Sequence, residues 1–198
     1  MRKLFTICLY TILLVYGIGM VSCKGKAVEA PLADEESDTT VVDTTYIMAI
    51  NQYICDVIGR QYVQSDVCIP CAYTVAVDET NKEDILVWGN FWVYNYQIIG
   101  DLLKTVSRGS HSGLMHVCKK DGCYEVTHFD AVADGAGYEE SAKKIFGEKY
   151  EELNRLTSNE EKREMMRRSV IADYVREHRL PISRYKDDGW PAATLPKK

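Results

Sequence analysis

The sequence has no stretch in which lysine and arginine dominate, and its 24 basic residues are outnumbered by 29 acidic ones. The formal net charge is −5 at pH 7. A nucleic-acid-binding surface needs clustered positive charge to neutralise phosphate groups. This composition therefore argues against nucleic acid as the main partner of the protein.

Catalytic and cofactor-binding signatures are missing as well. The chain contains no Walker motif, no dinucleotide fingerprint and no zinc-protease helix. The segment Gly109–Gly113, GSHSG, differs from the Gly-x-Ser-x-Gly elbow of serine hydrolases because His111 holds the central position. We interpret Arg108–Gly113 as a loop between strands. The sequence thus indicates no cofactor, no metal centre and no particular enzyme class.

A long uncharged apolar run does occur at the amino terminus. Arg2–Lys3 precede the run Leu4–Val21, and the composition turns polar directly after Cys23. This pattern resembles a bacterial lipoprotein signal, which ends in a lipobox with an aliphatic residue at the third position before an invariant cysteine. Met20–Val21 depart from the preferred lipobox residues. The resemblance implies cleavage before Cys23 and diacylation of its thiol.

On this interpretation residues 1–22 are the signal peptide, and residues 23–43 are the lipidated cysteine and a polar, flexible tether. The partner of Cys23 would then be a membrane of the bacterial cell envelope, with the domain facing the periplasm rather than the cell surface. Two alternatives stay open. The apolar run remains as a transmembrane anchor, because about 20 residues span a bilayer, or a non-lipid cut follows Ala30.

The first element of the mature domain is a predicted helix over Thr44–Gly59. Its apolar residues recur with helical spacing and make one stripe, which we expect to pack on a sheet. The stripe consists of Tyr46, Ile47, Ile50, Tyr53, Ile54, Val57 and Ile58.

Alternating apolar residues and turn signals then predict a bent antiparallel sheet of about five strands. The predicted strands are Val67–Asp78, Ile85–Ile98, Leu102–Val106, Leu114–Lys119 and Cys123–Asp130. In the second strand, Asn90 interrupts a series of large side chains on one face. Asn90 is either an inward polar group in a cavity or the site of a bulge beside Gly89.

Asp121–Gly122 is a strong hairpin signal, but the length of its loop decides which residues meet. A two-residue loop places Cys118 opposite Glu125, and a three-residue loop places it opposite Tyr124. A four-residue loop places Cys118 opposite Cys123, where a disulfide can form. The pattern does not choose among these three registers.

The same hairpin carries the candidate catalytic residues His116, His128 and Asp130. In the register with a three-residue loop, the two histidines share one face and can join an acid–base or metal-binding cluster. A lone histidine on a strand is otherwise a structural residue. The hairpin register therefore determines whether this group can act chemically.

Five of the seven cysteines follow Cys23, so at least one thiol stays unpaired within the chain. An exported protein can form disulfides, and the candidates are Cys68, Cys71, Cys118 and Cys123, paired within Cys68/Cys71 or as Cys118–Cys123. Inert thiols and a four-cysteine zinc site are the alternatives. A redox role for Cys68 and Cys71 is disfavoured, because a strand follows them and provides no helix terminus to lower a thiol pKa.

Two helices, Tyr138–Leu156 and Ser158–His178, are predicted after the sheet, the second beginning with a capping box at Ser158. The charged run Glu160–Arg168 is a solvated face or a docking surface. Trp190 in the tail either packs back onto the domain or serves as a recognition segment.

The sequence therefore predicts a single α+β domain over residues 44–198, with an N-terminal helix on the sheet and a C-terminal helical pair. A helix before a curved sheet in Thr44–Asp130 resembles the cystatin-like/NTF2-like α+β roll. Across the whole chain, the segments GSHSGLMHVCKKDGCYEVTHFD and SAKKIFGEKYEE resemble lipoproteins of Bacteroides-type bacteria. This resemblance implies an envelope location but no particular activity.

The expected function is a non-enzymatic module that binds a small-molecule ligand or a protein partner and is anchored through Cys23. The alternative is an envelope enzyme that acts in a pocket of the roll, with His116, His128 and Asp130 as its candidate residues.

Overall fold

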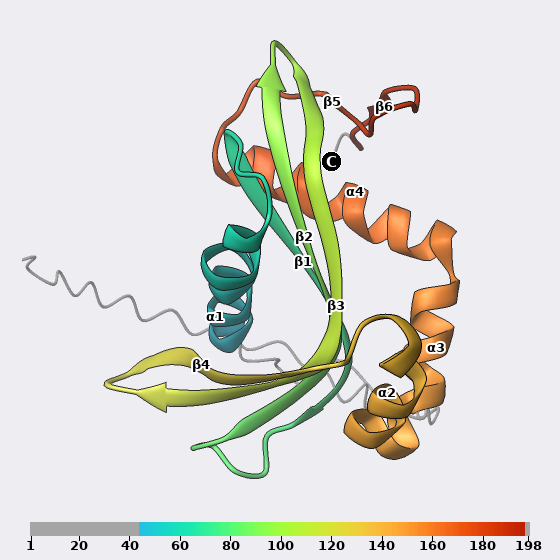
Figure 1. The fold of residues 1–198 in the computed structure, drawn as a ribbon. Helices are drawn as coiled ribbons and strands as arrows, with labels where there is room; N and C mark the ends of the chain where they lie inside the picture. The colour runs from blue at the N-terminus through green and yellow to red at the C-terminus, as the bar shows by residue number, and fades with distance from the viewer. Residues whose placement is uncertain (1–43, 197–198) are drawn as a thin grey trace, which may run out of the picture. The chain divides into compact units, whose positions relative to one another are not determined.

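The computed structural model describes residues 44–196, which form an α+β fold around a curled sheet (Figure 1). The α+β class predicted from the sequence is confirmed. The predicted signal peptide, the lipid attachment residue Cys23 and the tether lie outside the described residues. No helix between residues 44 and 196 is long and apolar enough to span a bilayer.

The sheet is built on three long, consecutive antiparallel strands, to which three others are added. The long strands are β1 (Val67–Asp78), β2 (Ile85–Ile99) and β3 (Leu102–Lys120), and the others are β4 (Cys123–Ala131), β5 (Arg184–Lys186) and β6 (Ala193–Thr194). Because β5 runs parallel to the first residues of β3, the sheet is mixed and not wholly antiparallel as predicted. The tail, for which no strand was predicted, contributes β5 and β6.

The segment Arg108–Gly113, predicted to be a loop, lies inside the continuous strand β3. Two glycines explain the difference. A Cβ at Gly109 would overlap the Tyr62 ring and hydroxyl, and a Cβ at Gly113 would overlap the Asp130 carbonyl oxygen. In a strand, glycine marks a close approach of other groups to the backbone. Here it permits that approach without ending the strand.

Three bulges accompany the curl of the long strands. Each bulge inserts one unpaired residue into one strand. The inserted residues are Val75 in β1, Val106 in β3 and Thr127 in β4. A bulge bends its strand and increases the local twist. The bulges thus help the sheet to curve around the helices that pack against it.

On one face of the sheet, four apolar residues of β2 belong to a buried cluster with residues of the first helix. That helix is α1 (Thr44–Tyr53), which continues as a π-helical turn (Ile54–Ile58) and a 3₁₀ turn (Gly59–Gln61). The cluster comprises Tyr46, Ile50, Ile54, Ile58, Ile85, Val87, Phe91, Val93, Met115 and Val117.

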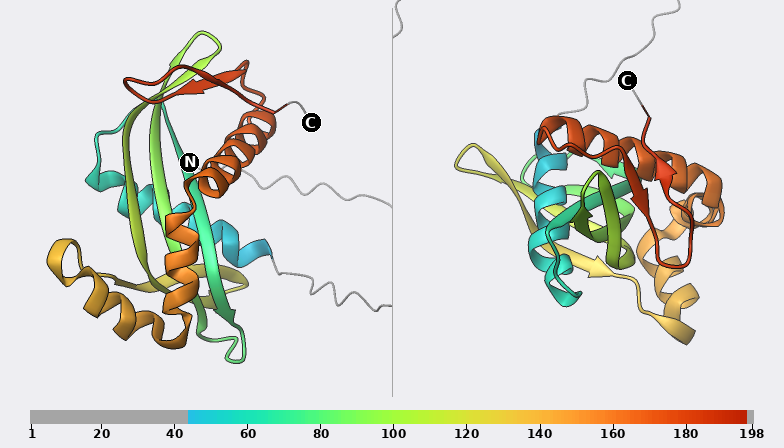
Figure 2. Two further views of the ribbon diagram at one scale, coloured as in Figure 1. Left: turned by 90° about the vertical axis from the view of Figure 1, so that its right-hand side faces the viewer. Right: turned by 90° about the horizontal axis from the view of Figure 1, so that it is seen from above.

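Three α-helices lie between β4 and β5 in the chain, where two were predicted, and they lie against the opposite face of the sheet (Figure 2). They are α2 (Tyr138–Phe146), α3 (Tyr150–Ser158) and α4 (Glu160–Glu177). Gly147, with φ +53°, separates α2 from α3, because glycine alone adopts this region without strain. Asn159 caps α4 by accepting from the Lys162 amide, so the predicted cap at Ser158 is wrong.

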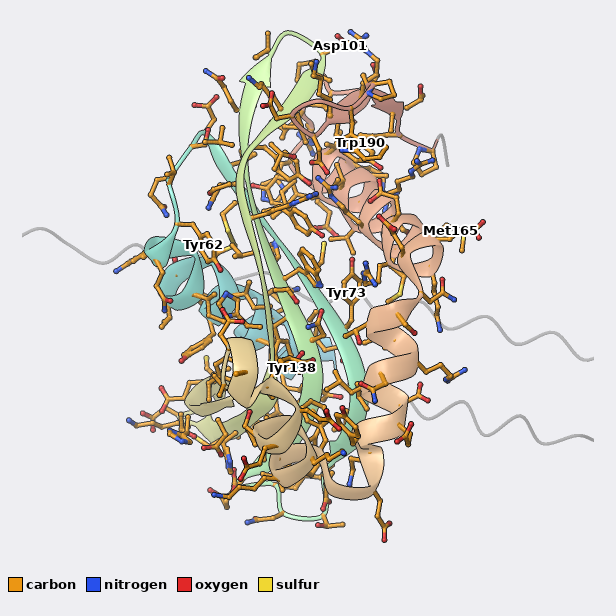
Figure 3. The ribbon with its side chains drawn as sticks, turned by 45° about the vertical axis from the view of Figure 1, so that its right-hand side comes forward. Tyr62, Tyr73, Asp101, Tyr138, Met165 and Trp190 are labelled. Carbon is orange, nitrogen blue, oxygen red and sulfur yellow. A yellow bond between two sulfur atoms is a disulfide. The ribbon has the colours of Figure 1, made fainter. Side chains whose placement is uncertain are left out.

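The tail returns to the sheet through Tyr185 and Leu195, which are 2% and 7% exposed in the same cluster as α4. Trp190, between them, is 70% exposed (Figure 3). The tail therefore packs back onto the domain, as one interpretation of Trp190 expected, but without using Trp190 itself.

The disulfide of the described residues joins Cys55 to Cys68, whose Cα atoms are 5.9 Å apart. The expected pairing within Cys68/Cys71 does not form, because residues three apart on a strand face opposite sides of the sheet. Cys118 lies opposite Glu125, as a two-residue loop requires, and does not meet Cys123. With Cys68 bonded to Cys55, the four-cysteine zinc site is not assembled, and Cys71, Cys118 and Cys123 are free thiols.

Replacing Cys55 with serine is expected to lower the free energy of unfolding by about 3 kcal/mol, because the disulfide closes a short loop in the unfolded chain. The check is chemical denaturation of the oxidised protein. The Cys118→Ser variant serves as the control, since it removes a thiol without removing a cross-link. Equal midpoints for the Cys55→Ser variant and the native chain would contradict the expectation.

Candidate functional site

The outer edge of β3 is shared between two strands that leave a gap. β5 covers Leu102–Lys104 and β4 covers Gly113–Lys120. Beside the gap lies a cavity of about 400 Å³, which we call the β3-edge cavity. Its wall is assembled from segments far apart in the sequence. They are Tyr62, Asn90, Trp92, Ser110–Ser112, Ala131–Asp134, Tyr138, Thr157 and Arg163.

Asn90 is the most deeply buried polar residue of this wall, with 1% of its surface exposed. Its Nδ2 donates to Ser110 Oγ and to Ser112 Oγ, both at 2.8 Å. Its Oδ1 is buried and has no hydrogen-bond partner. Of the two interpretations of Asn90, the structure agrees with the cavity, since the nearby bulge inserts Val75 of the neighbouring strand.

Trp92 lies two residues further along the same face of β2 and also lines the cavity. Its ring stacks on Tyr94, with centroids 5.4 Å apart and planes 9° apart. Its Nε1–H is buried and lacks an acceptor. Among residues 44–196, Asn90 Oδ1 and Trp92 Nε1 are the buried side-chain atoms without a partner, and each such atom costs about 1–3 kcal/mol.

Tyr62 and His111 form a hydrogen-bonded pair in the wall, with Oη and Nε2 2.8 Å apart. Burial lowers the pKa of His111, although the charge of Asp134 acts in the opposite direction. Burial and Asp134 both raise the pKa of Tyr62. At neutral pH the imidazole is therefore uncharged.

The wall contains two charged groups, and both are hydrogen-bonded to neutral backbone groups. The Asp134 carboxylate accepts from the Gly135 amide, and the Arg163 guanidinium donates to the Thr157 carbonyl. Ser112 Oγ and Tyr138 Oη lie 3.3 Å apart. The cavity thus presents mostly neutral hydrogen-bonding groups around one carboxylate and one guanidinium.

The predicted cluster of His116, His128 and Asp130 is brought together, by a route that the sequence did not indicate. The hairpin has a two-residue loop, with Lys120 opposite Cys123. In that register alone the histidines would alternate to opposite faces. The bulge at Thr127 shifts β4 by one residue and places His128 opposite His116.

Within this cluster, His116 Nε2 is 3.3 Å and His128 Nε2 is 3.0 Å from the Asp130 carboxylate, and His116 Nδ1 is 3.0 Å from Asp84. The His128 side chain is 65% exposed. In the described part of the chain, no three His, Cys, Asp or Glu residues are grouped to hold a metal ion. None of the three predicted residues lines the β3-edge cavity.

A second, more open cavity of about 810 Å³ lies between the first turns of α4 and the tail. Its lining includes both acidic and basic side chains together with Trp190. They are Glu160, Glu161, Glu164, Arg108, Arg168 and Lys186. Charges of both signs line this space, and they neutralise one another in part. Part of its lining belongs to the charged run Glu160–Arg168, which was predicted to be either a solvated face or a docking surface.

No family model, curated protein or solved structure matches this chain. The geometry of residues 44–196 is therefore what bears on function. Sequence reasoning identified Asn90 as a candidate cavity residue, because it breaks a series of large side chains. It missed Tyr62, Trp92 and Tyr138, whose aromatic side chains look like ordinary core residues in the sequence.

Proposed function

We propose that the protein is a lipid-anchored module of the bacterial envelope that binds a small polar molecule in the β3-edge cavity without converting it. The observation that carries this proposal is the pair of buried atoms, Asn90 Oδ1 and Trp92 Nε1, that lack hydrogen-bond partners in the wall of one cavity. Buried polar groups in native proteins are almost always satisfied by protein, water or ligand.

Both atoms are covered by neighbouring side chains, so a ligand in this cavity would satisfy them, by donating to Asn90 and accepting from Trp92, once that cover shifts. The volume of about 400 Å³ falls in the range of small-molecule sites. Asn90 is held by Ser110 and Ser112, and Trp92 is held by its stacking on Tyr94. These contacts hold both side chains beside the cavity, which limits the ordering entropy lost on binding.

Envelope location is supported by two independent features. The lipoprotein-like sequence ends at Cys23, and the Cys55–Cys68 disulfide is typical of an oxidising compartment. The order of α1 followed by four consecutive strands, with the first helix packed on the curled sheet, supports the cystatin-like/NTF2-like interpretation of residues 44–131. That fold by itself indicates no function.

Replacing Cys23 with serine is expected to abolish incorporation of labelled fatty acid and to move the protein out of the membrane fraction, because its acyl chains would be lost. The Cys123→Ser variant is the control, since it removes an exposed thiol from the folded domain. Undiminished membrane association without acylation would instead identify the apolar run as a transmembrane anchor.

Replacing Trp92 with phenylalanine is expected to release a small molecule that otherwise co-purifies with the full chain from its own envelope. Phenylalanine keeps an aromatic ring but removes the N–H, so affinity should fall about 3- to 10-fold, the worth of one hydrogen bond. Native mass spectrometry with thiol counting measures the bound mass.

The matched control for this experiment is Trp190→Phe, which alters the exposed tryptophan outside the β3-edge cavity. Thermal stability should not fall in the Trp92→Phe variant, because the change removes a buried donor that has no partner. A native chain that carries only water, or a ligand retained equally by both variants, would contradict the proposal.

An envelope enzyme is the second candidate, and the contacts of Asp130 with both His116 and His128 favour it. These groups can relay a proton between two imidazoles through a carboxylate. Turnover of an envelope component that disappears in the Asp130→Asn variant would replace the binding proposal.

A further inference from the structure

We infer that the ligand of the β3-edge cavity is a neutral polyhydroxylated molecule, of the class of monosaccharides and cyclic polyols. This inference rests on the proposed function and narrows it to one chemical class. It follows from the charge balance of the wall, from its hydroxyl groups and from the side-chain amide of Asn90, whose Nδ2 is hydrogen-bonded and whose Oδ1 is not.

The charge balance disfavours an ionic ligand. Asp134 and Arg163 carry opposite charges, and each is hydrogen-bonded to a neutral backbone group. His111 is uncharged at neutral pH, because burial lowers its pKa. The charges of Asp134 and Arg163 cancel, so an ionic ligand attracted to one of them would be repelled by the other while it paid the cost of leaving water. A neutral ligand has no such cost.

Hydroxyl groups dominate the polar part of the wall. They belong to Tyr62, Ser110, Ser112, Tyr138 and Thr157. A hydroxyl group donates one hydrogen bond, accepts others and rotates to suit its partner. A ligand rich in hydroxyl groups is the natural complement, because each of its groups can donate or accept as the wall requires.

Asn90 separates this class from amides and nucleobases. Recognition of an amide edge by asparagine uses its N–H and its C=O together. Both Nδ2 hydrogens of Asn90 are already directed to Ser110 and Ser112, and only Oδ1 remains. A single hydroxyl group can donate to that oxygen, whereas a planar donor–acceptor edge would find half of its partner occupied.

Trp92 offers the complementary donor at a separate point. It follows Asn90 by two residues on the same face of β2, which is roughly 7 Å along a strand. Asn90 and Trp92 therefore contact different parts of one ring-sized molecule. The rings of Trp92, Tyr62 and Tyr138 also provide apolar surface beside their polar atoms, which suits a molecule with both C–H and O–H groups.

The test is saturation-transfer NMR on the full chain in detergent micelles, with a panel of defined probes. The neutral probes are glucose, galactose, mannose and myo-inositol, and the matched probes are glucuronate, glucose 6-phosphate and uridine. We expect at least one neutral probe to bind and its charged counterpart to bind at least 10-fold more weakly. The affinity of the neutral probe should fall about 3- to 10-fold in Trp92→Phe and stay unchanged in Trp190→Phe.

Two results would overturn the inference, and they differ in what they leave standing. Binding of a charged probe or of uridine that depends on Trp92 would refute the polyol class and keep the ligand-binding function. Binding of no probe at all would refute the polyol class. If native mass spectrometry of the envelope-purified chain also shows a bare mass, the ligand-binding function is refuted as well.

Discussion

Replacing Asp187 with alanine is expected to lower the free energy of unfolding at pH 7 by about 3–5 kcal/mol, because a buried guanidinium loses the nearer of its two carboxylate partners and keeps only Glu164, at 3.5 Å. The Arg167 side chain is 3% exposed and donates to both carboxylate oxygens of Asp187, at 2.8 and 2.9 Å. It also donates to Tyr96 Oη and Thr105 Oγ1, and its Cζ lies 4.2 Å from the Tyr94 ring centroid.

The measurement is urea denaturation of both proteins, with the Asp188→Ala variant as the control. Asp188 is the exposed neighbour of Asp187, so its removal should leave the denaturation midpoint almost unchanged. Equal midpoints for the Asp187→Ala and Asp188→Ala variants would mean that the Arg167–Asp187 contact contributes nothing to stability.

The same contact predicts a dependence of stability on acid. Burial alone would raise the pKa of Asp187, but hydrogen bonds from Arg167 and Thr105 outweigh it and lower the pKa to about 2. In the unfolded chain the group titrates near 3.9. Its contribution is therefore complete above about pH 4 and is lost as the pH falls toward 2. The Asp187→Ala variant should lose less stability over this interval.

Asp101 titrates in the same interval, because hydrogen bonds from Arg184 and Ser183 lower its pKa to about 2 as well. The Asp187→Ala variant should therefore keep part of the acid sensitivity of the native chain. An acid-induced loss of stability that is identical in both proteins would show that Asp187 makes no contribution.

Replacing Gly113 with alanine is expected to destabilise the domain by about 3 kcal/mol, because the new methyl group overlaps a backbone atom that cannot move alone. The added Cβ would meet the carbonyl oxygen of Asp130 and the ring of Phe129. Relief requires β4 to shift against β3 at the point where their pairing ends, Gly113 opposite Ala131. Thermal denaturation by circular dichroism measures the loss.

Gly137→Ala is the matched control, because its Cβ would lie 3.5 Å from the nearest atom, an ordinary contact with Ala133. The backbone at Gly137, with φ −85°, accepts any residue. A similar loss in the two variants would attribute the effect to glycine replacement in general and not to the crowding at Gly113.

The sequence predicts well those helices and strands whose apolar residues recur at a regular spacing. The spacing from Thr44 predicts the helix that the structure contains as α1, and the alternation from Ile85 predicts β2. Both patterns reflect burial of one side of a single element. Asn90 is recognisable for the same reason, since a polar residue in such a series needs an explanation.

Features that depend on contacts between distant segments are those that the sequence does not predict. In the sequence Gly109 favours a loop. In the structure it lies in a strand, where the absence of a side chain makes room for Tyr62, which is distant in the sequence. Cys68 pairs with Cys55 only because the first helix is brought to β1. The β3-edge cavity combines residues from positions 62 to 163, so no local sequence pattern predicts it.

The disulfide between Cys55 and Cys68 encloses the segment that carries Tyr62, which lies over Gly109 and bonds His111. Oxidation converts this segment into a covalent ring, whose accessible conformations are far fewer than those of an open chain of equal length. The position of Tyr62 in the cavity wall is thus restricted once the disulfide has formed. A reducing environment would loosen this part of the wall without changing any residue that lines the cavity.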